Sequence, residues 1–416
     1  MGSRTLGFLV LWCCFFKYAS GQDTLRLSLV QAKALMLKQN LQLVASHFDL
    51  EASEANLLQA RAWNNPYFNW NQDLYSVEKN KYLNFQNQFL VQIDQVFSIA
   101  GKYTKTVKLA KLENIGNRFL VQDILRALLY ECALLYQETL LLQSKQALYR
   151  ESEEGYRMVI QSAQKQSELG FLANKELIRL QSELLALRTE SSQSAAAMHH
   201  AMGQLKMLLH LRPDVELVLE EPDTLPMEVP SLTNLMAKGE SNRADYLWSL
   251  NQIQVGEAQV QLQKAKAIPD ITLGYQPKDR GSNYVRPYSG IELGFELPLF
   301  HRNVGNIKAA QAQFKKAEIE AQRKENQLMN EIASSLKSFV EIKKSFERFS
   351  SSFLEEVDGL QKSAEQNYLK KNINILEYID LKRIYLQNRM QYLEVRSQLL
   401  ESAGKVNFTV GTEILP

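Results

Sequence analysis

The same unusual order of segments occurs twice in this chain, about two hundred residues apart. Each copy has an amphipathic helical segment, a proline, two alternating segments of strand type and then a very long helical run. Pro66 leads into residues 67–97 in the first copy, and Pro269 leads into residues 271–300 in the second. An internal repeat governs the whole architecture, because both copies must be built on one plan. We therefore predict one duplicated body, although 416 residues could hold two or three ordinary domains.

The prolines are distributed very unevenly. None lies between Pro66 and Pro213, and none lies between Pro298 and Pro416, whereas four lie close together from Pro213 to Pro230. Because proline breaks helices, the proline-free stretches permit long helices and the cluster indicates a linker. The predicted organisation is a signal peptide at 1–21, a first repeat at 22–212, a linker at 213–230, a second repeat at 231–404 and a tail at 405–416.

Two helical runs are long enough to form rods. Residues 103–168 are rich in good helix formers, and apolar residues in 304–368 recur at steps of three, four or seven. Such a run of roughly 65 residues would be on the order of 100 Å long. Returning helices are predicted at 177–210 and 376–404, and shorter helices at 29–62 and 232–267.

The strand segments alternate between apolar and polar residues. In residues 290–299 every second side chain is apolar, and the others are acidic, Gly or Pro; residues 85–97 alternate less regularly. Their partners would be residues 67–75 and 271–276. Strands of about ten residues with one apolar face are typical of a transmembrane β-barrel wall. The predicted lipid-facing residues are Ile291, Leu293, Phe295, Leu297, Phe89, Val91 and Ile93, and the predicted lumen-facing residues are Glu292, Glu296, Gln88, Gln92 and Asp94.

The N-terminus has the features of a secretory signal. Arg4 precedes an apolar run at residues 6–16, and the small residues 19–21 follow as a cleavage site. After cleavage, Cys132 would be the only cysteine of the mature chain. The alternative is that a cysteine of the leader is kept as a lipid attachment point. No later segment approaches the eighteen continuous apolar residues of a membrane-spanning helix.

Four strands per chain cannot close a membrane barrel, since known barrels begin at about eight strands and open edges are not tolerated in lipid. The chain must therefore assemble with copies of itself. A cyclic trimer would give twelve strands, and its helices would continue the same axis. We predict a mainly α fold with a small β part, in which the homotrimer forms a 12-stranded β-barrel and an α-helical barrel.

This plan resembles the TolC-type outer-membrane efflux family over essentially all of the mature sequence. The resemblance rests on the duplication, on the joints at Pro66 and Pro269, and on residues 298–306, which are similar to the heavy-metal and drug efflux branch. It implies a passive duct in the outer membrane of a Gram-negative bacterium. It also implies three partners: a periplasmic adaptor (membrane fusion) protein, an inner-membrane pump of the resistance-nodulation-division type and outer-membrane lipid.

The same resemblance implies a periplasmic gate of acidic residues just beyond the turns between long helices. Glu377 and Asp380 match this place in the second copy, and Glu176 matches it in the first. A ring of carboxylates in a constriction would favour cations. Lys371 stands where the family has a turn glycine, whereas Gly170 keeps it. An ordinary solvated helix face remains the alternative for these residues.

No catalytic constellation is present in the sequence. There is no phosphate-binding loop and no nucleophile elbow, so we expect neither an enzyme nor a cofactor. The segment from Met198 to Met202 includes His199 and His200, but methionines at this helical spacing are more often core residues than metal ligands. The net charge of +2 indicates no nucleic-acid partner. A periplasmic coiled-coil adaptor or scaffold, or a secreted surface coiled coil, remains the alternative function, and the exported substrate, metal cation or drug, stays open.

Overall fold

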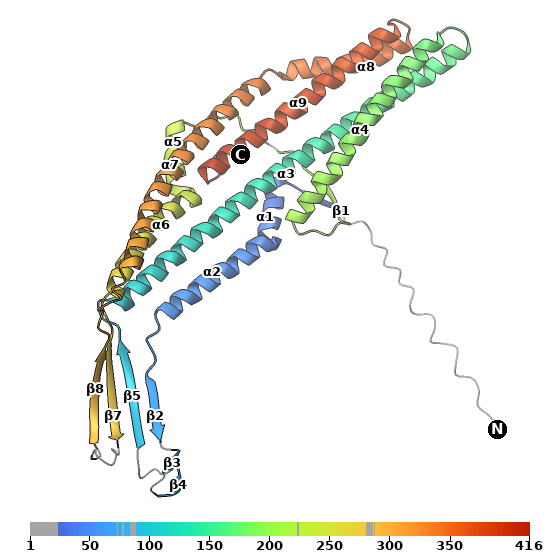
Figure 1. Cartoon of the computed structure of the whole chain (residues 1–416). Coiled ribbons are helices and arrows are strands. Elements are labelled where there is room, and N and C mark those ends of the chain that lie inside the picture. The colour runs from blue at the N-terminus through green and yellow to red at the C-terminus, as the bar shows by residue number, and fades with distance from the viewer. Residues whose placement is uncertain are drawn as a thin grey trace, which may run out of the picture.

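Strands and helices are segregated along a long molecule. The computed structural model describes residues 24–72, 74–76, 79–83, 89–222, 224–279, 286 and 288–416, so the predicted signal peptide lies outside the described residues. A four-stranded sheet occupies one end, and the turns of two helical hairpins lie at the opposite end (Figure 1). None of the described helices combines the length and the apolar character needed to cross a membrane.

The first repeat contains the longest helix of the described chain. Its helices are α1 (Leu29–Gln39), α2 (Leu41–Ala60), α3 (Lys102–Glu168) and α4 (Asn174–Leu208). The long helix predicted at 103–168 is therefore confirmed. The helix predicted at 29–62 is divided at Asn40, whose side chain accepts a hydrogen bond from the N–H of Leu43 and donates one to the carbonyl of Leu208. Asn is a favoured N-cap because its oxygen satisfies an otherwise unpaired helical N–H.

The second repeat has α5 (Leu232–Asn242), α6 (Ala244–Lys266), α7 (Val304–Phe346), α8 (Ser351–Leu369) and α9 (Ile375–Val410). The prediction of one unbroken helix over 304–368 was wrong. The chain leaves the helix after Phe346, and Ser350 starts α8 by accepting a hydrogen bond from the N–H of Phe353. Helix α9 continues beyond the predicted end at residue 404, so the first part of the expected tail is helical.

The main sheet joins the two copies edge to edge. Its antiparallel order is β2 (Tyr67–Gln72), β5 (Phe89–Phe97), β7 (Ile271–Asp279) and β8 (Tyr288–Phe295), which confirms the four predicted strands. A short hairpin of β3 (Tyr75–Ser76) and β4 (Lys81–Tyr82) extends it. The strand predicted over 290–299 was too long: β8 ends at Phe295, because Pro298 cannot donate to a ladder.

A second, smaller sheet was not predicted. Strands β1 (Thr24–Leu27) and β6 (Glu216–Leu219) pair in parallel, and β6 lies within the segment predicted as a linker. The hydroxyl oxygen of Tyr136 on α3 lies 2.9 Å from the carbonyl oxygen of Leu27 and 2.6 Å from that of Glu220, and it accepts a hydrogen bond from the N–H of Glu220, so it ties both strands to the long helix. Strands of four residues are too short for a readable alternation.

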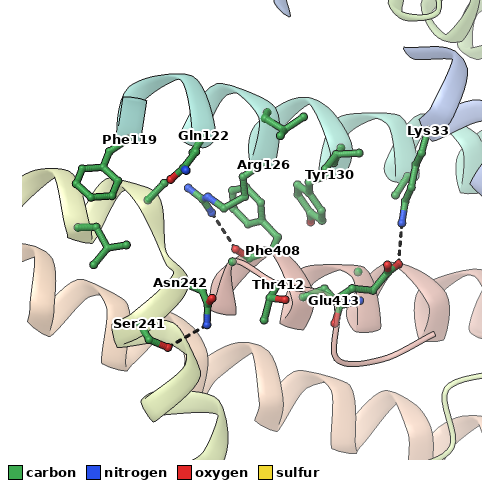
Figure 2. A pocket seen from close by; sticks show the side chains of 18 residues that line it. Lys33, Phe119, Gln122, Arg126, Tyr130, Ser241, Asn242, Phe408, Thr412 and Glu413 are labelled. Atoms are coloured by element: carbon green, nitrogen blue, oxygen red, sulfur yellow. Dashed lines mark hydrogen bonds and ion pairs between the residues drawn. The ribbon is translucent and has the colours of Figure 1, made fainter. Parts of the chain in front are cut away.

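The C-terminal end of α9 is held by two arginines from other elements. Arg126 on α3 donates to the carbonyl of Phe408 over 2.8 Å and stacks on its ring, beside a cavity of about 620 Å³ (Figure 2). Arg243, which separates α5 from α6 and is 3% exposed, donates to the carbonyl of Thr409. These bonds satisfy carbonyls that a helix end leaves unpaired.

Arg243 also forms a buried ionic network with Asp245 and Glu331. Its Nε lies 2.8 Å from Asp245 Oδ1, and Lys324 Nζ lies 3.1 Å from Asp245 Oδ2. Burial alone would raise the pKa of Asp245, but its hydrogen bonds and charge interactions with Arg243 and Lys324 hold that pKa below its usual value of 3.8. A carboxyl whose folded pKa is lowered stabilises the fold above its unfolded pKa and loses this contribution as pH falls through the folded value.

We predict that Asp245→Asn lowers the free energy of unfolding at neutral pH by about 3 kcal/mol, because it removes one of the two carboxylates that pair with the buried Arg243 and also the partner of Lys324. The parent should keep this contribution down to about pH 5 and lose it as the pH falls further, and the variant should show a smaller loss. Urea unfolding of the purified protein followed by circular dichroism measures both. Asp214→Asn is the matched control, since Asp214 pairs with Arg212 at the same spacing on the exposed surface. Equal pH profiles for the parent and Asp245→Asn would contradict the assignment.

Candidate functional site

One face of the four-stranded sheet is apolar and exposed. The register places Ile93, Tyr275 and Ile291 in one row across three strands. Because side chains alternate between the two faces of a strand, the next rows on this face include Leu293 and Phe295. The exposed fraction is 84% for Ile291, 59% for Phe295 and 44% for Ile93. No part of the described chain covers this face.

The predicted lipid-facing residues that lie in strands share this face, namely Phe89, Val91, Ile93, Ile291, Leu293 and Phe295. Leu297 lies beyond the end of β8 and is exposed. Phe68 and Trp70 of β2 extend the face through their pairing with Ile93 and Val91. An aromatic residue such as Trp70 is expected where a barrel wall meets the membrane interface. Phe68 was not predicted, because the mixed sequence of β2 shows no clean alternation, and only the register reveals it.

The opposite face holds a compact polar cluster. Gln92 Nε2 lies 2.7 Å from both Asp94 Oδ1 and Glu292 Oε2, and its Oε1 accepts a hydrogen bond from Gln276 over 3.0 Å. A Cβ at Gly274 would lie 2.5 Å from Asp94 Oδ1, so only glycine leaves room for this arrangement. Gln92 is 8% exposed. One amide therefore holds two carboxylates close together.

The predicted lumen-facing residues are only partly brought together. Gln92, Asp94 and Glu292 meet in this cluster, whereas Glu296 lies beyond the end of β8 and Gln88 lies outside the described residues. In the described chain neither Asp94 nor Glu292 forms an ion pair with a cationic side chain. Gln276 was missed, because its strand was predicted only as a pairing partner.

The opposite end of the molecule carries two similar turns. Gly170 follows α3 and Lys371 follows α8, and both have a positive φ, of 75° and 65°. The left-handed conformation is free for glycine and costs a residue with a Cβ on the order of 1 kcal/mol. The second turn therefore keeps its shape without its glycine. The exposed side chains of Phe171 and Lys371 lie together across the two turns, with Lys371 Nζ 5.6 Å from the ring centroid.

The three predicted gate carboxylates lie near these turns but in different surroundings. Glu377 Oε2 accepts a hydrogen bond from the N–H of Asn374 and completes a capping box at the start of α9. Asp380 is exposed and lines, with Glu377, a groove of about 500 Å³ between α4 and α9. Glu176 is half-buried in the first turn of α4 and does not line this groove. A solvated helix face and a gate are both compatible with these positions.

An ion pair crosses the groove. Arg383 on α9 pairs with Glu183 on α4, and these contacts raise the pKa of the guanidinium. The same groove is lined by Arg179, so acidic and basic groups alternate along it. An ion pair therefore connects the α3–α4 hairpin to the α8–α9 hairpin near their turns.

Metal ligands do not gather in the described part of the chain. No group of three or more His, Cys, Asp or Glu residues is placed to hold an ion there. His199 and His200 are exposed on α4. Cys132 is fully buried on α3, where burial raises the pKa of its thiol to about 11.

The fold and the sequence match known efflux proteins. Residues 240–412 match the family described as outer membrane efflux protein. The chain is therefore similar to this family over much of its second repeat. The chain is 21% identical over 389 residues to the cobalt-zinc-cadmium resistance protein CzcC of Cupriavidus metallidurans. The aligned residues cover 92% of this chain and 90% of CzcC.

Solved outer-membrane proteins share the fold of this chain. The Campylobacter jejuni outer membrane channel CmeC matches with a TM-score of 0.74 at 14% identity, over 92% of this chain and 85% of CmeC. The outer membrane protein VceC of Vibrio cholerae matches with a TM-score of 0.72 at 15% identity, over 92% of this chain and 96% of VceC. The fold predicted from the sequence and the predicted resemblance to outer-membrane efflux proteins are thus confirmed.

We predict that Ile291→Arg sharply lowers the amount of this protein in the outer membrane. Ile291 is the most exposed residue of the apolar face, and a charge on the lipid face of a barrel costs about 2–4 kcal/mol at the bilayer midplane. Immunoblotting of the outer-membrane fraction measures the effect. Thr272→Arg, on the opposite face of the neighbouring strand, is the control and should leave the amount near the parent level. Equal recovery of the two variants would contradict the lipid-facing assignment.

Proposed function

We propose that three copies of this efflux protein form a passive outer-membrane duct, which exports divalent transition-metal cations delivered by an inner-membrane pump through a periplasmic adaptor. One observation carries this proposal: the sheet has an exposed apolar face and two unpaired edges, at β2 and β8. Unpaired backbone groups are not tolerated in lipid. Pairing β8 of one copy with β2 of the next satisfies both edges at once.

The strand count allows either two or three copies. Two copies would supply eight strands and three would supply twelve, and both numbers reach the minimum of about eight for a barrel. The long helices favour three copies. They extend from the sheet as one layer, so the helices of all copies must close into a cylinder as wide as the barrel that continues it (Figure 1). The exposed apolar residues Leu41 and Phe48 on α2 would then be covered by the neighbouring copy.

Two features support metal cations as the substrate. The relative CzcC is named for resistance to cobalt, zinc and cadmium. Asp94 and Glu292 would face the duct, and threefold symmetry would place six carboxylates at one level, where a ring of negative charge favours cations. Drugs are the alternative substrate, and cells lacking the protein distinguish the two.

We expect deletion of the gene to increase sensitivity to zinc, cobalt and cadmium, and the purified protein to migrate as a heat-modifiable trimer that conducts cations in planar bilayers. Growth inhibition by graded metal concentrations measures the first, and gel mobility with and without heating measures the second. Sensitivity to dyes and detergents with unchanged metal tolerance would replace metals with drugs as the substrate. A monomer in the soluble fraction would overturn the duct itself.

The gate is proposed at the hairpin tips, where Glu377, Asp380 and Glu176 would narrow the periplasmic entrance. We predict that Glu377→Ala combined with Asp380→Ala raises single-channel conductance and weakens block by divalent cations, because two rings of negative charge are lost. Asp94→Asn is the comparison: it should reduce cation selectivity without relieving block at the tip. Glu377→Gln separates the gate from the capping box, since a glutamine can still accept the bond from Asn374. Unaltered block in the double variant would count against the gate.

A further inference from the structure

A buried ion pair lies where the α8–α9 hairpin packs against α3. Lys382 on α9 and Glu365 on α8 have their Nζ and Oε1 atoms 2.9 Å apart. The side chain of Lys382 is 1% exposed, and that of Glu365 is 20% exposed. Both charges belong to the same hairpin, so the pair stays together if the hairpin moves as a unit.

The surface of α3 opposite this pair is shaped to receive it. A Cβ at Gly155 would lie 2.3 Å from Glu365 Oε1 and 2.8 Å from Lys382 Nζ. Gly155 therefore forms a notch into which the charges fit. The rings of Tyr156 and Tyr385 lie on either side, each with its centroid 5.9 Å from Lys382 Nζ.

The same interface buries hydroxyl groups that the packing leaves unpaired. In the described structure the hydroxyls of Ser152, Tyr368 and Tyr378 have no hydrogen-bond partner, although Tyr378 is 0% and Ser152 is 1% exposed. The ring of Tyr378 contacts the rings of both Tyr156 and Tyr368. A buried polar group without a partner costs free energy that contact with water restores.

These features make the interface easier to separate than an apolar one. Burying an ion pair costs solvation that its mutual attraction only partly returns. When the α8–α9 hairpin leaves α3, the pair remains formed and regains water, and the hydroxyls become hydrated. An apolar interface of the same size would gain nothing on separation.

We propose that Gly155, Glu365 and Lys382 form a release surface, which keeps the α8–α9 hairpin separable from α3 and so sets how readily the tip of the duct opens. This rests on the proposed function, since it assigns a control element to the same duct. The charges act here by weakening the closed state. The Arg383–Glu183 contact at the groove has the opposite effect, because it joins the two hairpins and must break when they separate.

The decisive variant replaces both charges by apolar groups of similar size, Lys382→Met with Glu365→Leu. Replacing a buried ion pair in this way is often stabilising, so we expect the open probability in planar bilayers to fall on the order of tenfold, with parent amounts of heat-modifiable trimer. Arg389→Met with Asp358→Leu is the matched control. That pair joins the same two helices but is half-exposed, and its removal should leave the open probability unchanged.

A second variant tests the notch in the other direction. Gly155→Ala places a methyl group against both charges and displaces them, so the open probability should rise several-fold. Gly359→Ala is its control, because a Cβ at Gly359 meets no atom within 4 Å. The opposite signs of the two effects distinguish a release surface from general damage to the fold.

The outcomes separate the two proposals. A parent trimer that does not conduct would overturn the proposed function. A conducting parent whose double variant opens as readily as before, or fails to assemble, would overturn the release surface and leave the duct intact. An open probability that rises in the double variant would identify the pair as a latch that holds the tip closed, which also contradicts the inference.

Discussion

The unpaired backbone groups at β2 and β8 determine what this chain can be. A sheet of four strands with one exposed apolar face cannot remain alone in lipid, where every N–H and C=O must find a partner. Neither edge carries a feature that prevents pairing, such as a charged row or a covering helix, within the described strands. The two edges are therefore available to each other in neighbouring copies. Assembly, rather than a globular core, completes the structure.

The helices follow from this requirement. A layer of helices that continues a sheet needs helices that run unbroken over a long distance. Helix α3 is continuous over 67 residues. Two of the breaks, at Asn40 and at Ser350, occur where a polar side chain caps the start of the next helix, whereas the break at Arg243 has no such cap. Each of these two breaks lets the chain change direction between α1 and α2 or between α7 and α8, while α3 and α9 remain continuous. The continuous helices thus span the length of the helical part, and the breaks allow the neighbouring segments to bend.

Much of this architecture could be predicted from the sequence, because it depends on patterns longer than a single element. The proline-free runs predicted α3, and the alternation around Phe295 predicted the exposed face of the sheet. The division of the 304–368 helix was missed, because one serine outside a heptad seam is a weak signal. The pairing of β1 with β6 was missed for a different reason: it joins residues far apart in sequence through strands of four residues. Gln276 belongs to the polar face and Phe68 to the apolar face because of the strand register, and the sequence of a single strand does not specify with which residues it pairs.

The residues around Gly155 illustrate a general limit of sequence patterns. Lys382 lies on the apolar face of α9, one turn from Tyr378 and Tyr385, where a charged side chain is unexpected, and it is among the most buried side chains of the chain. Its burial depends on a missing side chain more than two hundred residues away, at Gly155, and on a carboxylate on a third helix.

The same geometry gives α9 two unlike ends. Near Val410 it is fixed by Arg126 and Arg243, which bind its last carbonyls. Near Lys382 it rests on α3 through charges that favour water. Helix α8 is joined to α7 only through the non-helical residues 347–350, so it can follow α9 without bending a continuous helix. A movement of the tip would therefore turn α9 about its clamped end and leave the sheet in place.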